Sequence, residues 1–367
     1  MSSILLVDDD HDMSAQLKAD LGNFLGADSD IRIEIWEPSQ KDGIDSKGKF
    51  ESLLDELNVG LVVTDFDLTK QGMSGLFGAT IVDWCQQNLV PVAEFSRMLE
   101  KKLPEEPNLF EMRIDLVSPA KQIASIYSGF KQVNEKLAGA RTGAEFKSFR
   151  SPAAALATIL NRVNEESLFA LYATRYVGAN SGLLDRIKKT LSKEIVPDED
   201  EKNSVLAYIC GHLLLNAVLR FPGPIMHREA LGAYCGVDPA SGTEIESIFD
   251  SCKYDGPFQD MGPFFWLDKI QNLIQIEAKR FEISAEYETE GEFNRIVVER
   301  ILQRQLPRHA CTRCQGQNGG FWCPLTRKTV CLRSSCSVAS TSWVPRGAQL
   351  CRIEREFYEE WAPILGA

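Results

Sequence analysis

The sequence lacks the features that would place it in several common classes of protein. Its first apolar run is interrupted by Asp8, so the N-terminus does not show the basic and then apolar pattern of a signal peptide. Its longest apolar helix candidate, residues 205–219, is shorter than a membrane span and contains Gly211 and His212. We therefore expect a cytoplasmic protein with no membrane-spanning segment.

Catalytic signatures and excess positive charge are also missing. The sequence contains no Ser-His-Asp set, no phosphate-binding glycine loop and no zinc-protease motif. Its 40 lysines and arginines against 52 aspartates and glutamates give a formal net charge of −12 at pH 7. This balance disfavours general nucleic-acid binding by the whole chain, because the phosphate backbone attracts positive charge. These absences favour a protein that acts through contacts with other proteins.

The length and composition predict several soluble globular domains. A chain of 367 residues is too long for one ordinary domain, and its hydrophobic content of 44% and charged content of 25% are typical of globular proteins. The glycine-containing segment 139–143 marks a border, and Ser151-Pro152 begins the next helix as a capping residue followed by proline. We expect an α/β domain over 1–140, a mainly α-helical domain over 141–300, and a small zinc-binding module with a tail over 301–367.

Two apolar runs end in acidic residues. Residues 4–7 are followed by Asp8, Asp9 and Asp10, and residues 61–64 are followed by Asp65. In open α/β sheets, functional groups gather at the carboxyl ends of the strands. Carboxylates that lie close together raise one another's pKa unless a cation lies among them, and oxygen ligands of this kind suit Mg²⁺. The sequence therefore predicts a cluster of carboxylates around a magnesium ion.

Strands and helices alternate along the first third of the chain. The apolar patterns predict strands over 4–7, 31–36, 61–65, 90–95 and 112–117 and helices over 12–25, 50–57, 75–88 and 120–137. This order, the acidic strand ends and the loop 68–75 with its Gly72-Met73-Ser74-Gly75 resemble the receiver domain of bacterial response regulators. The resemblance implies a doubly wound, five-stranded parallel sheet in the order 2-1-3-4-5.

The same resemblance implies a set of site residues and a partner. Asp65 takes the place of the phosphoryl acceptor, Asp8 and Asp9 hold Mg²⁺ together with it, and a sensor histidine kinase supplies the phosphoryl group. Ser96 takes the place of the serine or threonine that ends the fourth strand in receivers. A serine there can also simply satisfy a backbone group at the end of a strand.

The fifth strand departs from the receiver pattern. Receivers carry a lysine directly before a proline here, whereas this chain has Ser118 before Pro119. Lys121 is our candidate for the lysine role. Either it reaches back from a shifted turn, or the role is lost.

Half of the ten cysteines lie between residues 311 and 336. In a reducing compartment such crowding indicates metal binding rather than disulfides. Cys311 and Cys314, followed by Gly316, have the spacing of a zinc knuckle. Cys331 and Cys336 are expected to complete a closed, structural Zn²⁺ site, with Cys323 as a substitute ligand. His309 is a poorer candidate, and free cysteines in a small core are the alternative.

Residues 229–237 resemble the first helix and turn of a helix-turn-helix motif. The helix expected after them carries Glu244, Glu246 and Asp250, whereas a recognition helix needs arginine, lysine, asparagine or glutamine. We therefore expect an ordinary helical hairpin.

The function expected is that of a two-component response regulator with a non-enzymatic output, as an adaptor or a phosphate sink that contacts another regulator or effector protein. The alternatives are a DNA-binding transcriptional regulator, an enzyme within the helical domain, and a receiver that accepts no phosphate.

Overall fold

The computed structural model describes residues 3–26, 30–38, 45–69, 76–95, 108–141, 149, 151–173, 178–192, 199–283, 287, 289–316, 319–339 and 343–365. The chain divides into two compact units. The first comprises Met1–Leu103, Asn108–Val163 and Tyr176–His212, and the second comprises Pro104–Pro107, Asn164–Arg175 and Leu213–Ala367. Each unit is described by itself below.

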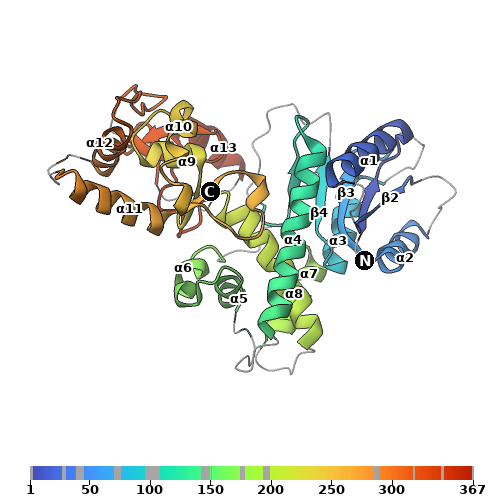
Figure 1. Ribbon diagram of the computed structural model, residues 1–367. Helices are drawn as coiled ribbons and strands as arrows, with labels where there is room; N and C mark the ends of the chain where they lie inside the picture. The colour runs from blue at the N-terminus through green and yellow to red at the C-terminus, as the bar shows by residue number, and fades with distance from the viewer. Residues whose placement is uncertain are drawn as a thin grey trace. The chain divides into compact units, whose positions relative to one another are not determined.

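The first unit is built on a five-stranded parallel sheet in the order β2-β1-β3-β4-β5 (Figure 1). The predicted α/β fold and strand order are thereby confirmed. The strands are β1 (Ser3–Val7), β2 (Arg32–Trp36), β3 (Val59–Asp65), β4 (Val92–Phe95) and β5 (Met112–Ile114), and the helices between and after them are α1 (His11–Leu25), α2 (Ser46–Leu57), α3 (Gly78–Asn88) and α4 (Pro119–Arg141).

The central strands are buried on both sides, which explains their continuous apolar sequence. All five residues of β1 are buried, and so are Leu61 to Thr64 of β3. The cluster on one side of the sheet joins strand residues such as Leu5 and Val62 to side chains of α2 and α3. Helix α1 packs against α4. The result is a sheet covered by helices, as the sequence predicts.

The register of the sheet brings the two acidic strand ends together. Strands β1 and β3 are neighbours, and Val7 lies opposite Thr64. The next residues, Asp8 and Asp65, therefore leave adjacent strands at the same edge of the sheet. The N–H of Met13 donates to the side chain of Asp10, which caps α1 and fixes the path of the chain directly after Asp8 and Asp9.

Three further helices belong to the first unit. They are α5 (Pro152–Ile159), α7 (Ser181–Leu191) and α8 (Glu199–Leu213), the last of them up to His212. Helix α5 packs on α4, and the side chain of Asn180 joins the start of α7 to α3 by donating to the backbone oxygen of Asp83 at 3.0 Å. Residues 140 and 300, where domain borders are predicted, lie within the first and the second compact unit respectively.

A buried histidine lies in the core of this unit. His212 of α8 is 0% exposed, and neither ring nitrogen makes a hydrogen bond within the described part of the chain. Its ring stands edge-on to Tyr208, Phe130 and Phe110, with centroids 4.6, 5.0 and 5.2 Å away. Burial lowers the pKa of His212 to about 3. The sequence-based expectation of a core histidine is consistent with this environment.

Replacing His212 by phenylalanine is expected to stabilise the first unit and to flatten its pH dependence. Below the ordinary histidine pKa of 6.5 the unfolded chain binds a proton that the folded chain excludes until about pH 3. Wild-type stability should therefore fall by about 2 kcal/mol between pH 7 and pH 5 through this residue alone. His212→Phe should remove that slope and add about 1–3 kcal/mol at pH 7, because two unpaired polar atoms leave the core. Urea unfolding at both pH values measures this.

Tyr208→Phe provides the matched control. The Tyr208 hydroxyl is also buried without a hydrogen-bond partner among the described residues, but it does not titrate between pH 5 and pH 7. This variant should gain stability equally at both pH values. A full wild-type slope in His212→Phe would show that the acid sensitivity arises elsewhere.

Within its described residues, the second unit combines helices with three two-stranded sheets. Strands β6 and β7, β8 and β9, and β10 and β11 form these antiparallel pairs. The elements of this unit are α6 (Glu166–Ala170), the π-helical turn η4 (Leu214–Val218), β6 (Ile225–His227), α9 (Arg228–Tyr234), η5 (Pro239–Ser241), α10 (Gly242–Glu246), η6 (Asp250–Cys252), η7 (Gln259–Met261), β7 (Phe264–Trp266), α11 (Leu267–Arg280), α12 (Glu290–Leu302), β8 (Gly319–Cys323), β9 (Lys328–Cys331), β10 (Ser337–Val338), β11 (Ile353–Glu354) and α13 (Arg355–Leu365), with the 3₁₀ turn η3 (Val163–Glu165) at the border.

Helices α9 and α10 pack against each other across a tight turn. Gly236 in this turn has φ +63°, and a Cβ there would meet the backbone oxygen of Gly291 at 2.3 Å, so glycine is required. Most of this unit's core gathers around α9, α11 and α12. Among the described helices, none combines the length and the apolar composition that crossing a membrane requires.

Candidate functional site

Three carboxylates converge at the carboxyl edge of the sheet. One oxygen each from Asp8, Asp9 and Asp65 lies within 4.8 Å of the other two. Asp8 and Asp9 follow β1, and Asp65 ends β3. The convergence follows from the pairing of the two strands, since residues that extend past paired positions leave the sheet side by side. The structure thus brings together the three residues predicted to hold Mg²⁺.

The electrostatics of the cluster favour a bound cation. Burial, and then the nearby charges of Asp65 and Asp9, raise the pKa of Asp8 to about 6, although the N–H of Asp10 donates to its Oδ1 at 2.8 Å. Among the described residues, no positively charged side chain lowers the pKa of Asp8. An all-oxygen donor set of partly buried carboxylates fits a hard divalent ion such as Mg²⁺. The residues present can therefore hold the ion that the receiver resemblance implies.

Mg²⁺ is expected to stabilise the first unit more at pH 7.5 than at pH 5. Without the ion, the raised pKa of Asp8 means that its favourable contribution to folding is lost as the pH rises through about 6. A bound divalent ion offsets the repulsion among the carboxylates, and its binding stabilises the folded state in proportion to its affinity. Thermal melts with Mg²⁺ or with a chelator at both pH values measure the difference. An equal shift at both pH values, or none, would contradict the assignment.

Asp65 is oriented by its own strand end. The N–H of Phe66 donates to Oδ1 of Asp65 at 2.7 Å, which fixes the plane of the carboxylate. At the start of α3, the N–H of Gly78 donates to the backbone oxygen of Phe66 at 3.0 Å. A Cβ at Gly78 would meet the backbone oxygen of Asp65 at 2.5 Å. The first residue of α3 must therefore be glycine for the helix to approach the strand end this closely.

Gly78 is a site residue that the sequence analysis did not identify. It also did not identify two exposed aromatic side chains near the site. Phe66 directly follows Asp65 and Phe77 directly precedes α3, and their side chains are 44% and 46% exposed. Phe77 also pairs with Asp67 in an isolated β-bridge. An aromatic residue directly after a strand-end aspartate was visible in the sequence, but its exposure depends on how the loop folds.

The two remaining residues predicted for this site have different outcomes. Ser96, together with most of the loop 68–75, lies outside the described residues. Lys121 lies exposed in the first turn of α4. Its ammonium group is not among the charges that shift the pKa of Asp8. The lysine role therefore stays a prediction.

The second candidate metal site is a cluster of four cysteines in the second unit. The sulfur atoms of Cys311, Cys314, Cys331 and Cys336 all lie within 4.8 Å of one another. The Sγ atoms of Cys314 and Cys331 are 3.8 Å apart. Tetrahedral coordination with Zn–S bonds of about 2.3 Å places two sulfurs ~3.8 Å apart, so the spacing fits Zn²⁺.

Local turns present the first two thiols. The N–H of Gln315, which has φ +56°, donates to the oxygen of Cys311 at 2.8 Å. The N–H of Gly316 donates to Sγ of Cys314 at 3.4 Å and lowers the pKa of Cys314 to about 7. A lowered pKa favours the thiolate form that binds a metal. The knuckle is therefore formed by backbone hydrogen bonds as its sequence indicates.

The other two thiols come from the end of β9 and from the turn after it. The oxygen of Cys331 accepts from the hydroxyl of Ser337 at 2.5 Å, and the N–H of Cys336 donates to the oxygen of Arg333 at 2.9 Å. Burial raises the pKa of Cys331 to about 12. Buried thiols stay protonated in the absence of an ion, and metal binding requires that they lose their protons.

Cys323 does not belong to this cluster. The hairpin β8–β9 pairs Cys323 with Lys328 and Gly319 with Cys331, so the two cysteines lie at opposite ends of the ladder. Sγ of Cys323 instead accepts from the N–H of Glu354 at 3.4 Å. The expectation that Cys323 serves as a substitute ligand is corrected by this register. His309 is buried and is likewise outside the cluster.

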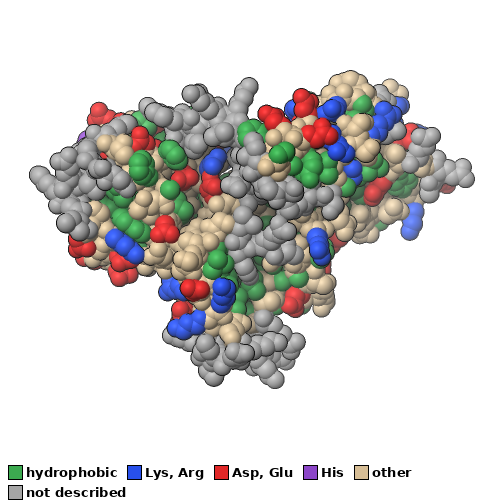
Figure 2. All heavy atoms as spheres, turned by 180° about the vertical axis from the view of Figure 1, so that it is seen from behind, with side chains coloured by type: hydrophobic (Ala, Val, Ile, Leu, Met, Phe, Trp, Pro, Cys, Tyr) green, Lys and Arg blue, Asp and Glu red, His purple; other side chains and the backbone are tan. Residues whose placement is uncertain are grey.

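The acidic residues of the helical hairpin are engaged in ion pairs. Glu246 pairs with Arg228, Glu244 pairs with Arg304, and Asp250 pairs with Lys253 at 2.7 Å. On the face drawn in Figure 2, lysine and arginine side chains are interspersed with aspartate and glutamate. The described side chains on this face do not form the continuous basic surface that duplex binding requires.

The chain was compared with protein-family models, with curated proteins and with solved structures, and none of them matches it.

Proposed function

We propose that the chain is a two-component response regulator whose first unit accepts a phosphoryl group on Asp65. The observation that carries the proposal is the convergence of the carboxylates of Asp8, Asp9 and Asp65 at the carboxyl edge of a parallel sheet in the order 2-1-3-4-5. This edge is where open α/β sheets carry their chemistry. The donor in this proposal is a phosphohistidine of a sensor kinase.

The chemistry follows from the roles of the three carboxylates. Asp8 and Asp9 would hold Mg²⁺ from β1, and Asp65 would contribute one oxygen from β3. When bound, the ion supplies positive charge that neutralises the phosphoryl oxygens. The N–H of Phe66 holds Oδ1 of Asp65, so the carboxylate is presented in one orientation. An oxygen of Asp65 forms the new O–P bond while the P–N bond of the donor breaks, and the leaving imidazole keeps the electron pair and takes up a proton.

The remaining receiver residues have proposed roles beside this acceptor. Ser96 would hydrogen-bond the phosphoryl group from the end of β4. Lys121 would supply the cation if the start of α4 moves toward the acidic cluster. A chain without that lysine contact would still accept phosphate, but the modification would be less well coupled to a conformational change.

The output is proposed to be non-enzymatic. The second unit would act through contacts with another regulator or an effector protein, as an adaptor or as a sink for phosphoryl groups. The four cysteines would hold a structural Zn²⁺, since all four positions of a tetrahedral site are filled by protein ligands. A DNA-binding regulator that uses α9 and α10 is the weaker alternative, because the acidic side chains after the turn are already paired with cations of the chain.

Phosphate incorporation tests the proposal directly. The purified chain is incubated with a small phosphodonor such as acetyl phosphate, with Mg²⁺ or with a chelator, and acid-labile phosphate is measured. The proposal predicts incorporation that requires the ion. Absence of incorporation with Mg²⁺ would leave a receiver-like fold that is not a phosphoacceptor.

Salt-dependent binding to duplex DNA distinguishes the alternative. If the chain binds random duplex DNA at low salt, and if its affinity falls steeply as the salt concentration increases, the alternative of a DNA-binding regulator is favoured. The proposed adaptor shows no such binding.

A further inference from the structure

The four thiols of the cysteine cluster differ in their exposure to solvent. Cys311, Cys331 and Cys336 are 0%, 1% and 1% exposed, whereas Cys314 is only partly buried. Cys314 lies in the knuckle turn, and both of its neighbours in the chain are exposed. A reagent dissolved in water therefore meets the sulfur of Cys314 before it meets the other three.

Glycine leaves one side of this sulfur uncovered. A Cβ at Gly316 would lie 3.1 Å from Sγ of Cys314, so a larger residue there would place its side chain against the sulfur. The same point lies 3.8 Å from Cζ of Arg333, so a guanidinium group lies beside the uncovered side. Reactive cysteines lie in partly exposed, electropositive surroundings of this kind.

A second thiol lies close to Cys314. Sγ of Cys331 is 3.8 Å from Sγ of Cys314, and a disulfide requires that the two sulfurs close to about 2.05 Å. Because Cys331 is buried, it is shielded from direct attack by a dissolved oxidant. Cysteines that sense oxidants are accessible and often lie next to a resolving thiol. The pair therefore has the arrangement of an oxidised cysteine and its resolving partner.

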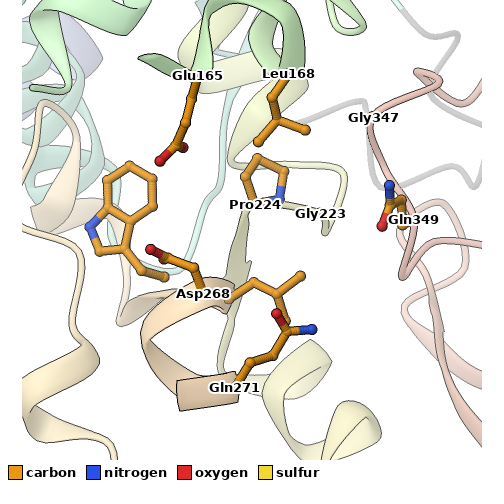
Figure 3. A pocket seen from close by; sticks show the side chains of 10 residues that line it. Glu165, Leu168, Gly223, Pro224, Asp268, Gln271, Gly347 and Gln349 are labelled. Carbon is orange, nitrogen blue, oxygen red and sulfur yellow. The ribbon is translucent and has the colours of Figure 1, made fainter. Parts of the chain in front are cut away.

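The cavity around Trp266 in the same unit provides no route to the cluster. It has a volume of about 220 Å³, and residues of four chain segments line it, among them Glu165, Pro224 and Gln349 (Figure 3). None of the four cluster cysteines is among its described lining residues. An oxidant does not reach Cys314 through this cavity, so the exposed knuckle is its route.

We propose that the cysteine cluster is a peroxide-sensitive switch in which Cys314 is the oxidised residue and Cys331 is the resolving residue. The switch depends on the proposed Zn²⁺ site and adds a means of regulating it. It is independent of the proposed phosphoacceptor role of Asp65.

The reaction consumes one molecule of hydrogen peroxide. The thiolate of Cys314 attacks one peroxide oxygen, so that an S–O bond forms, the O–O bond breaks and the departing hydroxide takes up a proton. The thiolate of Cys331 then attacks the sulfur of Cys314, so that an S–S bond forms, the S–O bond breaks and a second hydroxide takes up a proton. The sulfurs lose two electrons, and peroxide is reduced to two waters. The two thiolates that remain, Cys311 and Cys336, are fewer than the four ligands of a structural site, so zinc is released.

Zinc release from the zinc-loaded full chain measures the switch. Zinc content is determined first, and hydrogen peroxide is then added with a coloured zinc chelator, with a sample that receives only the chelator as the baseline. Wild type should release its zinc, and mapping of unreduced peptides should find a disulfide between Cys314 and Cys331. A dithiol reductant with added Zn²⁺ should restore the zinc content, because a disulfide is reversible.

Two histidine substitutions separate reactivity from metal binding. Cys314→His keeps a zinc ligand but removes the accessible sulfur, so peroxide should release zinc at least about tenfold more slowly than in wild type. Cys336→His makes the same exchange at a buried ligand and leaves the reacting pair in place, so zinc release should keep the wild-type rate. Zinc measured in each variant before oxidation shows whether the site has assembled.

Trapping of the first oxidation product requires no substitution. Excess dimedone, which labels sulfenic acids, is present during a brief exposure of the wild type to peroxide, and it should label Cys314. Label on a buried cysteine of the cluster, a disulfide between other cysteines, retention of zinc by the oxidised wild type, or wild-type release from Cys314→His would overturn the proposal. Zinc absent before oxidation would instead defeat the zinc assignment on which the switch depends.

Discussion

Asp65→Asn is expected to abolish the Mg²⁺-dependent incorporation of acid-labile phosphate from acetyl phosphate. The neutral amide is a poor nucleophile and cannot form the acyl phosphate, whereas its shape and its bond from the N–H of Phe66 can be retained. The loss should therefore be complete rather than partial, with the sheet intact. Phosphate released by acid treatment, measured for wild type and variant side by side, provides the readout.

Asp67→Asn is the control for this experiment. Asp67 lies two residues further on, and its Oδ1 accepts from the N–H of Thr69 at 3.1 Å, so it shapes the loop and is outside the carboxylate cluster. Incorporation should persist in this variant. Equal incorporation by Asp65→Asn and wild type would remove Asp65 as the acceptor, and loss in both variants would point to loop distortion.

Cys331→Ser is expected to release the zinc ion and to unfold the cysteine module. Structural Zn²⁺ in small domains contributes roughly 10–16 kcal/mol of binding free energy at neutral pH, and this energy is coupled to folding. Cys331 ends β9 and is buried, so the loss of its thiolate leaves three ligands and a weakened hairpin. Metal analysis of protein purified without chelator should find zinc in the wild type and little in the variant.

Cys323→Ser supplies the matched control in the same hairpin. Cys323 is equally buried, but its sulfur accepts only a backbone N–H from Glu354 among the contacts described, a role that a hydroxyl can fulfil. This variant should keep its zinc. Zinc absent from the wild type, or lost equally from both variants, would contradict the four-cysteine assignment.

The sheet and the carboxylate cluster were predictable because both follow from local patterns. The apolar runs before Asp8 and Asp65 define buried strands whichever helices cover them, and the strand order of the receiver resemblance places their ends together. The position of the Cys323 thiol was not predictable in the same way. It depends on the register of the β8–β9 hairpin, which alternation alone does not specify.

Features that depend on contacts between distant segments could not be predicted from the sequence. The packing of α5, α7 and α8 into the first unit joins residues far apart in the chain, and composition alone does not indicate such contacts. The requirement for glycine at Gly78 arises only when α3 approaches the end of β3. The cavity around Trp266 is likewise assembled from four separate segments, none of which carries a recognisable motif.

Chemical trapping of the acyl phosphate followed by peptide mass spectrometry tests the central claim most directly. The chain is treated with acetyl phosphate and Mg²⁺, reduced with borohydride, which converts an aspartyl phosphate to homoserine, and digested. The account predicts one reduced position, Asp65, present with Mg²⁺ and absent with a chelator. Reduction at another aspartate, or none at all under conditions in which the sheet is folded, would contradict it.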